Sequence, residues 1–117
     1  MAERNPAPID ISIERSPGEP TTVTVAVRGE IDLDTSGELS AAFAALGQPT
    51  RVEVDLGGVE YMDSTGLRVL LAARSDLDDR GAEMEVVRAS SIVVRLLEIT
   101  GLGELVAEAE APESERP

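Results

Sequence analysis

Apolar and polar residues alternate in the first third of the chain. Two runs carry the alternation: Ile9, Ile11 and Ile13, then Val23, Val25 and Val27. A period of two predicts strands with one buried face. Residues 16–20, Ser-Pro-Gly-Glu-Pro, are typical of a turn. The pattern therefore predicts an antiparallel hairpin, whose second strand runs on as far as Leu33.

From residue 35 onward, stretches with helical spacing appear between further strands. Helices are predicted over residues 35–46, 64–80 and 91–99, and strands around Val52, Val54 and Leu56 and around Met84, Val86 and Val87. Thr35-Ser36-Gly37-Glu38 fits a capping box, with Thr35 as N-cap and Glu38 reaching back. Gly47, Gly81 and Gly101 are placed to end the three helices.

The order of these elements predicts an α/β fold with a mixed sheet of about four to five strands. Strand–helix–strand crossovers are right-handed and place neighbouring strands parallel. Because the strands alternate instead of being apolar throughout, we expect the helices to pack mainly on one face. Residues 9–106 are predicted to form one domain, preceded by a loose arm (1–8) and followed by an acidic, disordered tail (107–117).

Composition narrows the possible functions. The 117 residues contain no His, Cys, Lys or Trp. That excludes His-based acid–base catalysis, Cys or Lys nucleophiles, His or Cys zinc sites and a P-loop, and we expect no cofactor. A net charge of −13 argues against direct nucleic-acid binding. No apolar run is long enough to span a membrane and the start is unlike a signal peptide, so a cytoplasmic protein is expected.

The segment Asp63-Ser64-Thr65-Gly66-Leu67 follows the third strand, after a short predicted loop, and opens the second helix. Loops at the carboxyl ends of strands often carry function in open α/β sheets. Asp-Ser-Thr is also a good helix N-cap string, and most such strings are only caps. Gly66 costs up to ~1 kcal/mol relative to Ala in a helix, which predicts a close approach to the backbone. Leu67 begins the buried face, so Ser64 should be exposed.

Three blocks of sequence carry a family pattern. They are Gly29-Glu30-Ile31-Asp32 followed by Leu39, then Val54-Asp55-Leu56 through Met62-Asp63-Ser64-Thr65-Gly66-Leu67, and then Gly81 to Val87 with Val94 to Leu102. Together they resemble the STAS domain, the fold shared by sulfate transporters and anti-sigma factor antagonists. The resemblance covers about residues 9–106 and implies a single STAS domain. The central block is the most specific of the three.

The resemblance implies an anti-sigma factor antagonist. Stand-alone members of the family bind an anti-sigma factor that is also a serine kinase, and so free a sigma factor. The matching serine here is Ser64: the partner kinase would phosphorylate and inactivate the chain, and a PP2C-type phosphatase would reverse this. The partner-binding residues expected on this basis are Asp32, Asp63, Ser64, Thr65, Gly66, Leu67 and Arg68. Arg68 departs from the family pattern, since many members have Gly there.

A phosphate on Ser64 should be tolerated by the fold, because the helix dipole and free first-turn amides favour it. Nearby acidic residues should instead make it repel the partner. The residues leave open whether Asp32 is only a polar strand-end residue and whether Thr65 is a second phosphorylation site. A stand-alone STAS subunit of a transporter or stress-signalling scaffold is an alternative. An enzyme with Ser64 as nucleophile lacks a suitable base, so none is expected.

Overall fold

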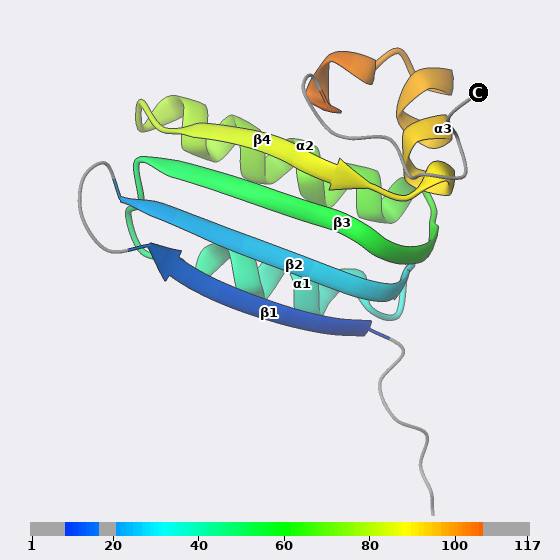
Figure 1. Ribbon diagram of the computed structural model, residues 1–117, viewed down its shortest axis with the longest axis horizontal. Helices are drawn as coiled ribbons and strands as arrows, with labels where there is room; N and C mark the ends of the chain where they lie inside the picture. The colour runs from blue at the N-terminus through cyan, green and yellow to red at the C-terminus, as the bar shows by residue number, and fades with distance from the viewer. Residues whose placement is uncertain (1–8, 17–20, 107–117) are drawn as a thin grey trace, which may run out of the picture.

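The computed structural model describes residues 9–16 and 21–106. The predicted arm 1–8, most of the hairpin turn (17–20) and the predicted tail 107–117 lie outside the described residues. The elements in chain order are β1 (Ile9–Ser16), β2 (Thr22–Ile31), α1 (Ser36–Ala44), β3 (Arg51–Met62), α2 (Ser64–Asp79), β4 (Glu83–Ala89), α3 (Ser91–Ile99) and a 3-10 turn, η1 (Gly103–Val106) (Figure 1).

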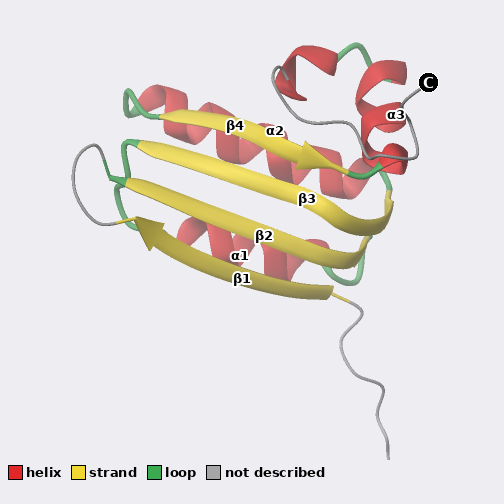
Figure 2. Ribbon diagram, viewed as in Figure 1, coloured by secondary structure: helices red, strands yellow, loops and turns green. Residues whose placement is uncertain are grey.

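The four strands form one mixed sheet in the order β1-β2-β3-β4. β1 pairs antiparallel with β2, while β2 with β3 and β3 with β4 are parallel. The predicted α/β class, the hairpin and the parallel crossovers are confirmed. The carboxyl ends of the three parallel strands therefore meet at one end of the sheet, where the connections to α1, α2 and α3 begin (Figure 2).

The helices do not share one layer. α1 and α2 pack against each other behind the sheet, as predicted (Figure 1). They cover the strand positions that alternate as buried residues: Val23, Val25 and Val27 in β2, then Val52, Val54 and Leu56 in β3. α3 instead follows the carboxyl end of β4 and contacts β3 and β4. The turn η1 contacts β4 and α3. Gly101, at φ +78°, ends α3 as predicted.

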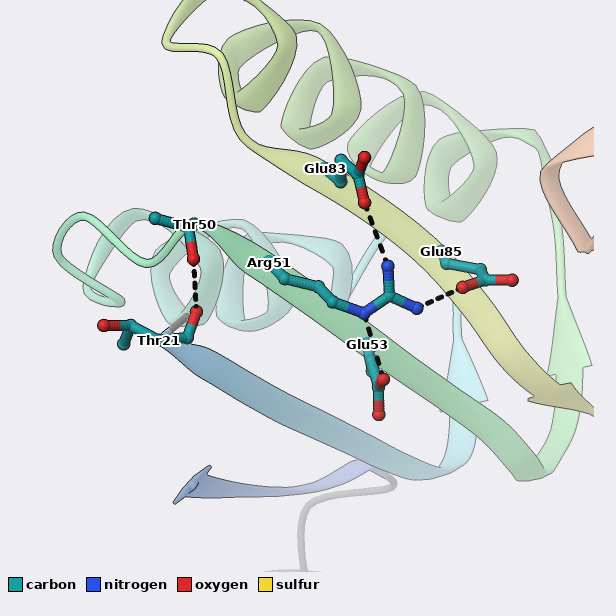
Figure 3. Close-up of polar contacts among 6 residues, drawn as sticks. All are labelled: Thr21, Thr50, Arg51, Glu53, Glu83 and Glu85. Carbon is teal, nitrogen blue, oxygen red and sulfur yellow. Dashed lines mark hydrogen bonds and ion pairs between the residues drawn. The ribbon is translucent and has the colours of Figure 1, made fainter. Parts of the chain in front are cut away.

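The opposite face of the sheet is polar, and Arg51 organises one end of it (Figure 3). Its guanidinium donates to Glu53 at 3.1 Å, to Glu83 at 3.0 Å and to Glu85. The hydrogen bonds to Glu85 and then to Glu53 raise the pKa of Arg51, because they stabilise its charged form. One cation thus joins the amino ends of β3 and β4 and offsets part of a local excess of carboxylates.

β3 is longer than the sequence predicts. The predicted strand around residues 52–56 continues to Met62, and the predicted loop before α2 is reduced to Asp63. Gly57 and Gly58 have the composition of a turn but lie within the strand, because β2 continues beside them with shifts of register. A Cβ at position 58 would lie 2.7 Å from Cγ of Arg28, so the absence of a side chain at Gly58 leaves room for the Arg28 side chain on the neighbouring strand.

Candidate functional site

The carboxyl ends of β2 and β3 bring two distant segments together. Ile31 pairs with Met62 in the parallel ladder, and the next residue, Asp63, donates its backbone N–H to the Ile31 carbonyl at 3.2 Å. The turn after β2, which begins at Asp32, therefore lies beside the start of α2. The sheet places these two predicted site segments side by side.

Asp63 is the N-cap of α2. Its carboxylate accepts hydrogen bonds from the Thr65 N–H at 2.9 Å and from the Thr65 hydroxyl at 2.5 Å. Its carbonyl accepts from the N–H groups of Gly66 at 3.1 Å and Leu67 at 3.2 Å. The hydroxyl bond from Thr65 lowers the pKa of Asp63, while burial opposes the shift. Asp63 is thus an ionised cap that already uses most of the first-turn amides, which were predicted to be free.

Ser64 differs from both of its neighbours. It is exposed at the first position of α2, and within residues 9–16 and 21–106 its hydroxyl has no hydrogen-bond partner. Thr65 is half-buried and its hydroxyl is bonded to Asp63. The helix-cap interpretation therefore accounts for Asp63 and Thr65 and leaves the Ser64 hydroxyl available to another molecule.

Gly66 and Leu67 are buried at the start of α2, and their expected contact with a partner stays a prediction. The close approach predicted at Gly66 comes from within the fold: a Cβ there would lie 2.6 Å from Cγ2 of Ile31 and 2.7 Å from Cγ of Met62. Leu67 is only 7% exposed and belongs to the core. Together they hold the start of α2 against the ends of β2 and β3.

Asp32 closes the turn that follows β2. Its carboxylate accepts from the N–H groups of Asp34 at 3.0 Å and Thr35 at 3.2 Å. Thr35 lies at the N-cap position of α1, but the predicted capping box with Glu38 is wrong, since no side chain caps this helix. The Thr35 hydroxyl instead donates to the Glu30 carbonyl at 2.8 Å and accepts from the Asp32 N–H at 2.9 Å, which fastens the turn to the strand.

Leu33 lies in this turn beside the candidate site, and the sequence analysis did not single it out. It is 75% exposed, more than any other large apolar side chain in the described part of the chain. The available signal was an apolar residue between two aspartates just after a strand. Arg68 is exposed on α2, four residues after Ser64 and so on the same side of the helix.

Metal-binding clusters and membrane-spanning helices are both absent from the described residues. No group of three or more Asp, Glu, His or Cys side chains in the described residues is placed to hold a metal ion. None of the helices in that same part of the chain is long and apolar enough to cross a membrane.

Comparison with known proteins places the chain among regulatory proteins. A family model described as Mlab, STAS domain matches residues 15–107. The anti-sigma-B factor antagonist of Listeria monocytogenes is 34% identical over 100 residues, which cover 84% of this chain and 88% of the relative. The Staphylococcus aureus protein of the same name is 38% identical over 93 residues, which cover 78% and 86%.

Solved structures agree with these relatives. An anti-sigma factor antagonist from Mycobacterium paratuberculosis matches with a TM-score of 0.69 and 26% identity, over 89% of this chain and 86% of that one. Unphosphorylated SpoIIAA, an anti-sigma factor antagonist, shares the fold with a TM-score of 0.66 and 20% identity, over 89% and 90%. On the family match and the curated relatives, this chain belongs to the STAS-domain anti-sigma factor antagonist family.

Proposed function

We propose that this chain is an anti-sigma factor antagonist that binds a kinase-type anti-sigma factor while Ser64 is bare, which frees a sigma factor. Phosphorylation of Ser64 by that kinase ends the binding, and a PP2C-type phosphatase restores it. The observation that carries the proposal is the exposed Ser64 hydroxyl, without a partner among the described residues, at the sheet end where β2 and β3 finish.

Ser64 suits the role of a substrate better than that of a catalytic nucleophile. The neighbouring carboxylate, Asp63, is engaged by Thr65, and its lowered pKa makes it a weaker base. The chain contains no His or Lys that could replace it. Thr65 is a poorer phosphate acceptor than Ser64, because its hydroxyl would first have to leave Asp63. We therefore expect a single modification, introduced by another protein.

A phosphate at Ser64 acts on the interface more than on the fold. The cap formed by Asp63 does not involve the Ser64 hydroxyl, so we expect the start of α2 to keep its conformation after phosphorylation. Phosphoserine adds about −1.5 to −2 charges. Asp63 and Asp34 already make this surface acidic, so a partner fitted to it would have to desolvate a dianion beside carboxylates. Such a mismatch costs about 2–5 kcal/mol, or roughly 30-fold to several thousand-fold in Kd.

The test is phosphorylation by the anti-sigma factor serine kinases encoded in the same genome, each purified and used with Mg-ATP. Intact mass should show one added phosphate with at least one kinase, and peptide mapping should place it on Ser64. A PP2C-type phosphatase should remove it. The alternative, a STAS subunit of a transporter or scaffold, predicts no kinase-dependent mass change.

Two variants make this test specific. Ser64→Ala should take up no phosphate. Ser91→Ala is the matched control, because Ser91 is also an exposed serine at the first position of a helix, α3. It should be modified like the wild type. The proposal fails if no kinase modifies the wild type, or if Ser64→Ala is modified as well as Ser91→Ala.

A further inference from the structure

The large apolar side chain of Leu33 is exposed to solvent at the end of the sheet that we propose binds the kinase. It is 75% exposed. Leu33 lies two residues beyond Ile31, and Ser64 lies two residues beyond Met62, the residue that pairs with Ile31. Paired strands run about 4.8 Å apart. The hydrogen bond from Asp63 N–H to the Ile31 carbonyl then ties the two exits together. Leu33 and Ser64 thus emerge as neighbours.

The backbone of Leu33 is fixed by hydrogen bonds on both sides. The N–H groups of Asp34 and Thr35 donate to the Asp32 carboxylate, and the Thr35 hydroxyl bridges the Asp32 N–H and the Glu30 carbonyl. These bonds define the turn before any partner arrives. A side chain presented from an ordered turn loses less conformational entropy on binding than one on a loose loop. An exposed apolar side chain on such a preorganised turn is therefore well suited to enter an apolar pocket of a partner.

The charges around Leu33 define the chemistry of the complementary surface. Asp32 and Asp34 flank it in the chain, and Asp63 is an ionised neighbour across the strand ends. Arg68 adds one positive charge to the site, one helical turn beyond Ser64. A partner that covers Leu33 must therefore offer an apolar pocket with a basic rim.

We propose that Leu33 is the apolar anchor by which this chain holds its anti-sigma factor kinase, inserted into an apolar pocket whose rim is basic. The inference rests on the proposed function and names the residue that supplies affinity, whereas Ser64 supplies regulation. A phosphate on Ser64 would add negative charge to the rim of the surface centred on Leu33. The surface around Leu33 and Ser64 would thus account both for binding of the kinase and for its dissociation after phosphorylation.

The experiment measures Kd for each purified anti-sigma factor serine kinase of the same genome, with wild type, Leu33→Ala, Leu33→Met and Ile99→Ala. Ile99 is the matched control, since it is 73% exposed and lies on α3. Leu33→Ala should weaken binding by about 10- to 100-fold. Leu33→Met, which keeps the apolar volume, should stay within about threefold of wild type. The Kd of Ile99→Ala should also stay within about threefold of the wild-type value. Because Leu33 is exposed, its substitution should leave the free energy of unfolding unchanged.

The outcomes separate the anchor from the function. If no kinase binds or phosphorylates the wild type, the proposed function fails and the anchor fails with it. If the wild type binds and is phosphorylated but Leu33→Ala binds equally well, only the anchor is overturned. Equal losses in Leu33→Ala and Ile99→Ala also overturn it, because the affinity would then be spread over the surface.

Discussion

Gly66 packs the start of α2 directly against the sheet, and adding one methyl group there tests that geometry. In Gly66→Ala, the new Cβ would lie 2.6 Å from Cγ2 of Ile31 and 2.7 Å from Cγ of Met62. Optimal carbon–carbon contacts are about 3.5–4.0 Å. Ile31 is fully buried and Met62 almost so, and both clashing atoms are close to their backbones. Neither side chain can turn away into solvent.

The expected cost follows from two opposing effects. Replacing Gly by Ala in a helix stabilises it by up to about 1 kcal/mol. Forcing an extra methyl group into a packed core costs about 1–3 kcal/mol. Since two buried neighbours must move, we expect the clash to prevail and the free energy of unfolding to fall by about 1–2 kcal/mol.

The assay is urea denaturation followed by circular dichroism, with Gly37→Ala as the control. Gly37 is also in the first turn of a helix, α1, but a Cβ there would meet nothing within 4 Å. Gly37→Ala should therefore leave stability unchanged or raise it by up to about 1 kcal/mol. If Gly66→Ala is as stable as Gly37→Ala, Gly66 is not required by the packing of Ile31 and Met62.

Two further predictions concern charge. Because the Thr65 hydroxyl bond lowers the pKa of Asp63, the carboxylate stabilises the fold above its ordinary pKa of about 3.9, and this contribution is lost as pH falls through the folded value. Asp63→Ala should thus cost about 1 kcal/mol near neutral pH. The deficit should shrink in acid, and a pH-independent deficit in denaturation experiments would refute the cap. Arg51→Gln leaves three carboxylates without their cation and should lower the free energy of unfolding by up to about 1 kcal/mol at low salt. High salt should reduce the loss, and equal losses at both salts would contradict the electrostatic explanation.

Local sequence signals predicted most of the fold. Alternating valines in β2 and β3 indicated which face is buried, and glycines with a positive φ, such as Gly81 and Gly101, ended helices where expected. The order of strands and helices then implied the parallel pairings. The alternation and the helix ends depend on residues close in the chain, and the order of elements was enough to imply the longer-range pairings.

The wrong predictions involve contacts outside the short sequence pattern on which each prediction rested. Gly57 and Gly58 have the composition of a turn, yet pairing with β2 keeps them in β3. Thr35 fits a capping box, but the end of β2 offers its hydroxyl a backbone carbonyl to bond instead. In both cases a partner about 5 to 30 residues away outweighed a local preference, as tertiary contacts often do.

The candidate site was only partly predictable. The segment around Ser64 could be singled out, but whether each of its residues faces the core or solvent depended on packing. Gly66 packs closely against Ile31 and Met62 at the ends of β2 and β3, and Leu33 was overlooked because an apolar residue near a strand end is expected to be buried. Exposure of a single leucine follows from the turn geometry at Asp32, which no periodicity reveals.

Whether Ser64 controls binding can be measured by comparing two forms of the same chain. Bare and enzymatically phosphorylated protein, each confirmed by intact mass, should be titrated against the kinase that modifies Ser64, without ATP. We expect phosphorylation to raise Kd by at least roughly 30-fold, while circular dichroism shows the same fold for both forms. Equal Kd values for the two forms would contradict it.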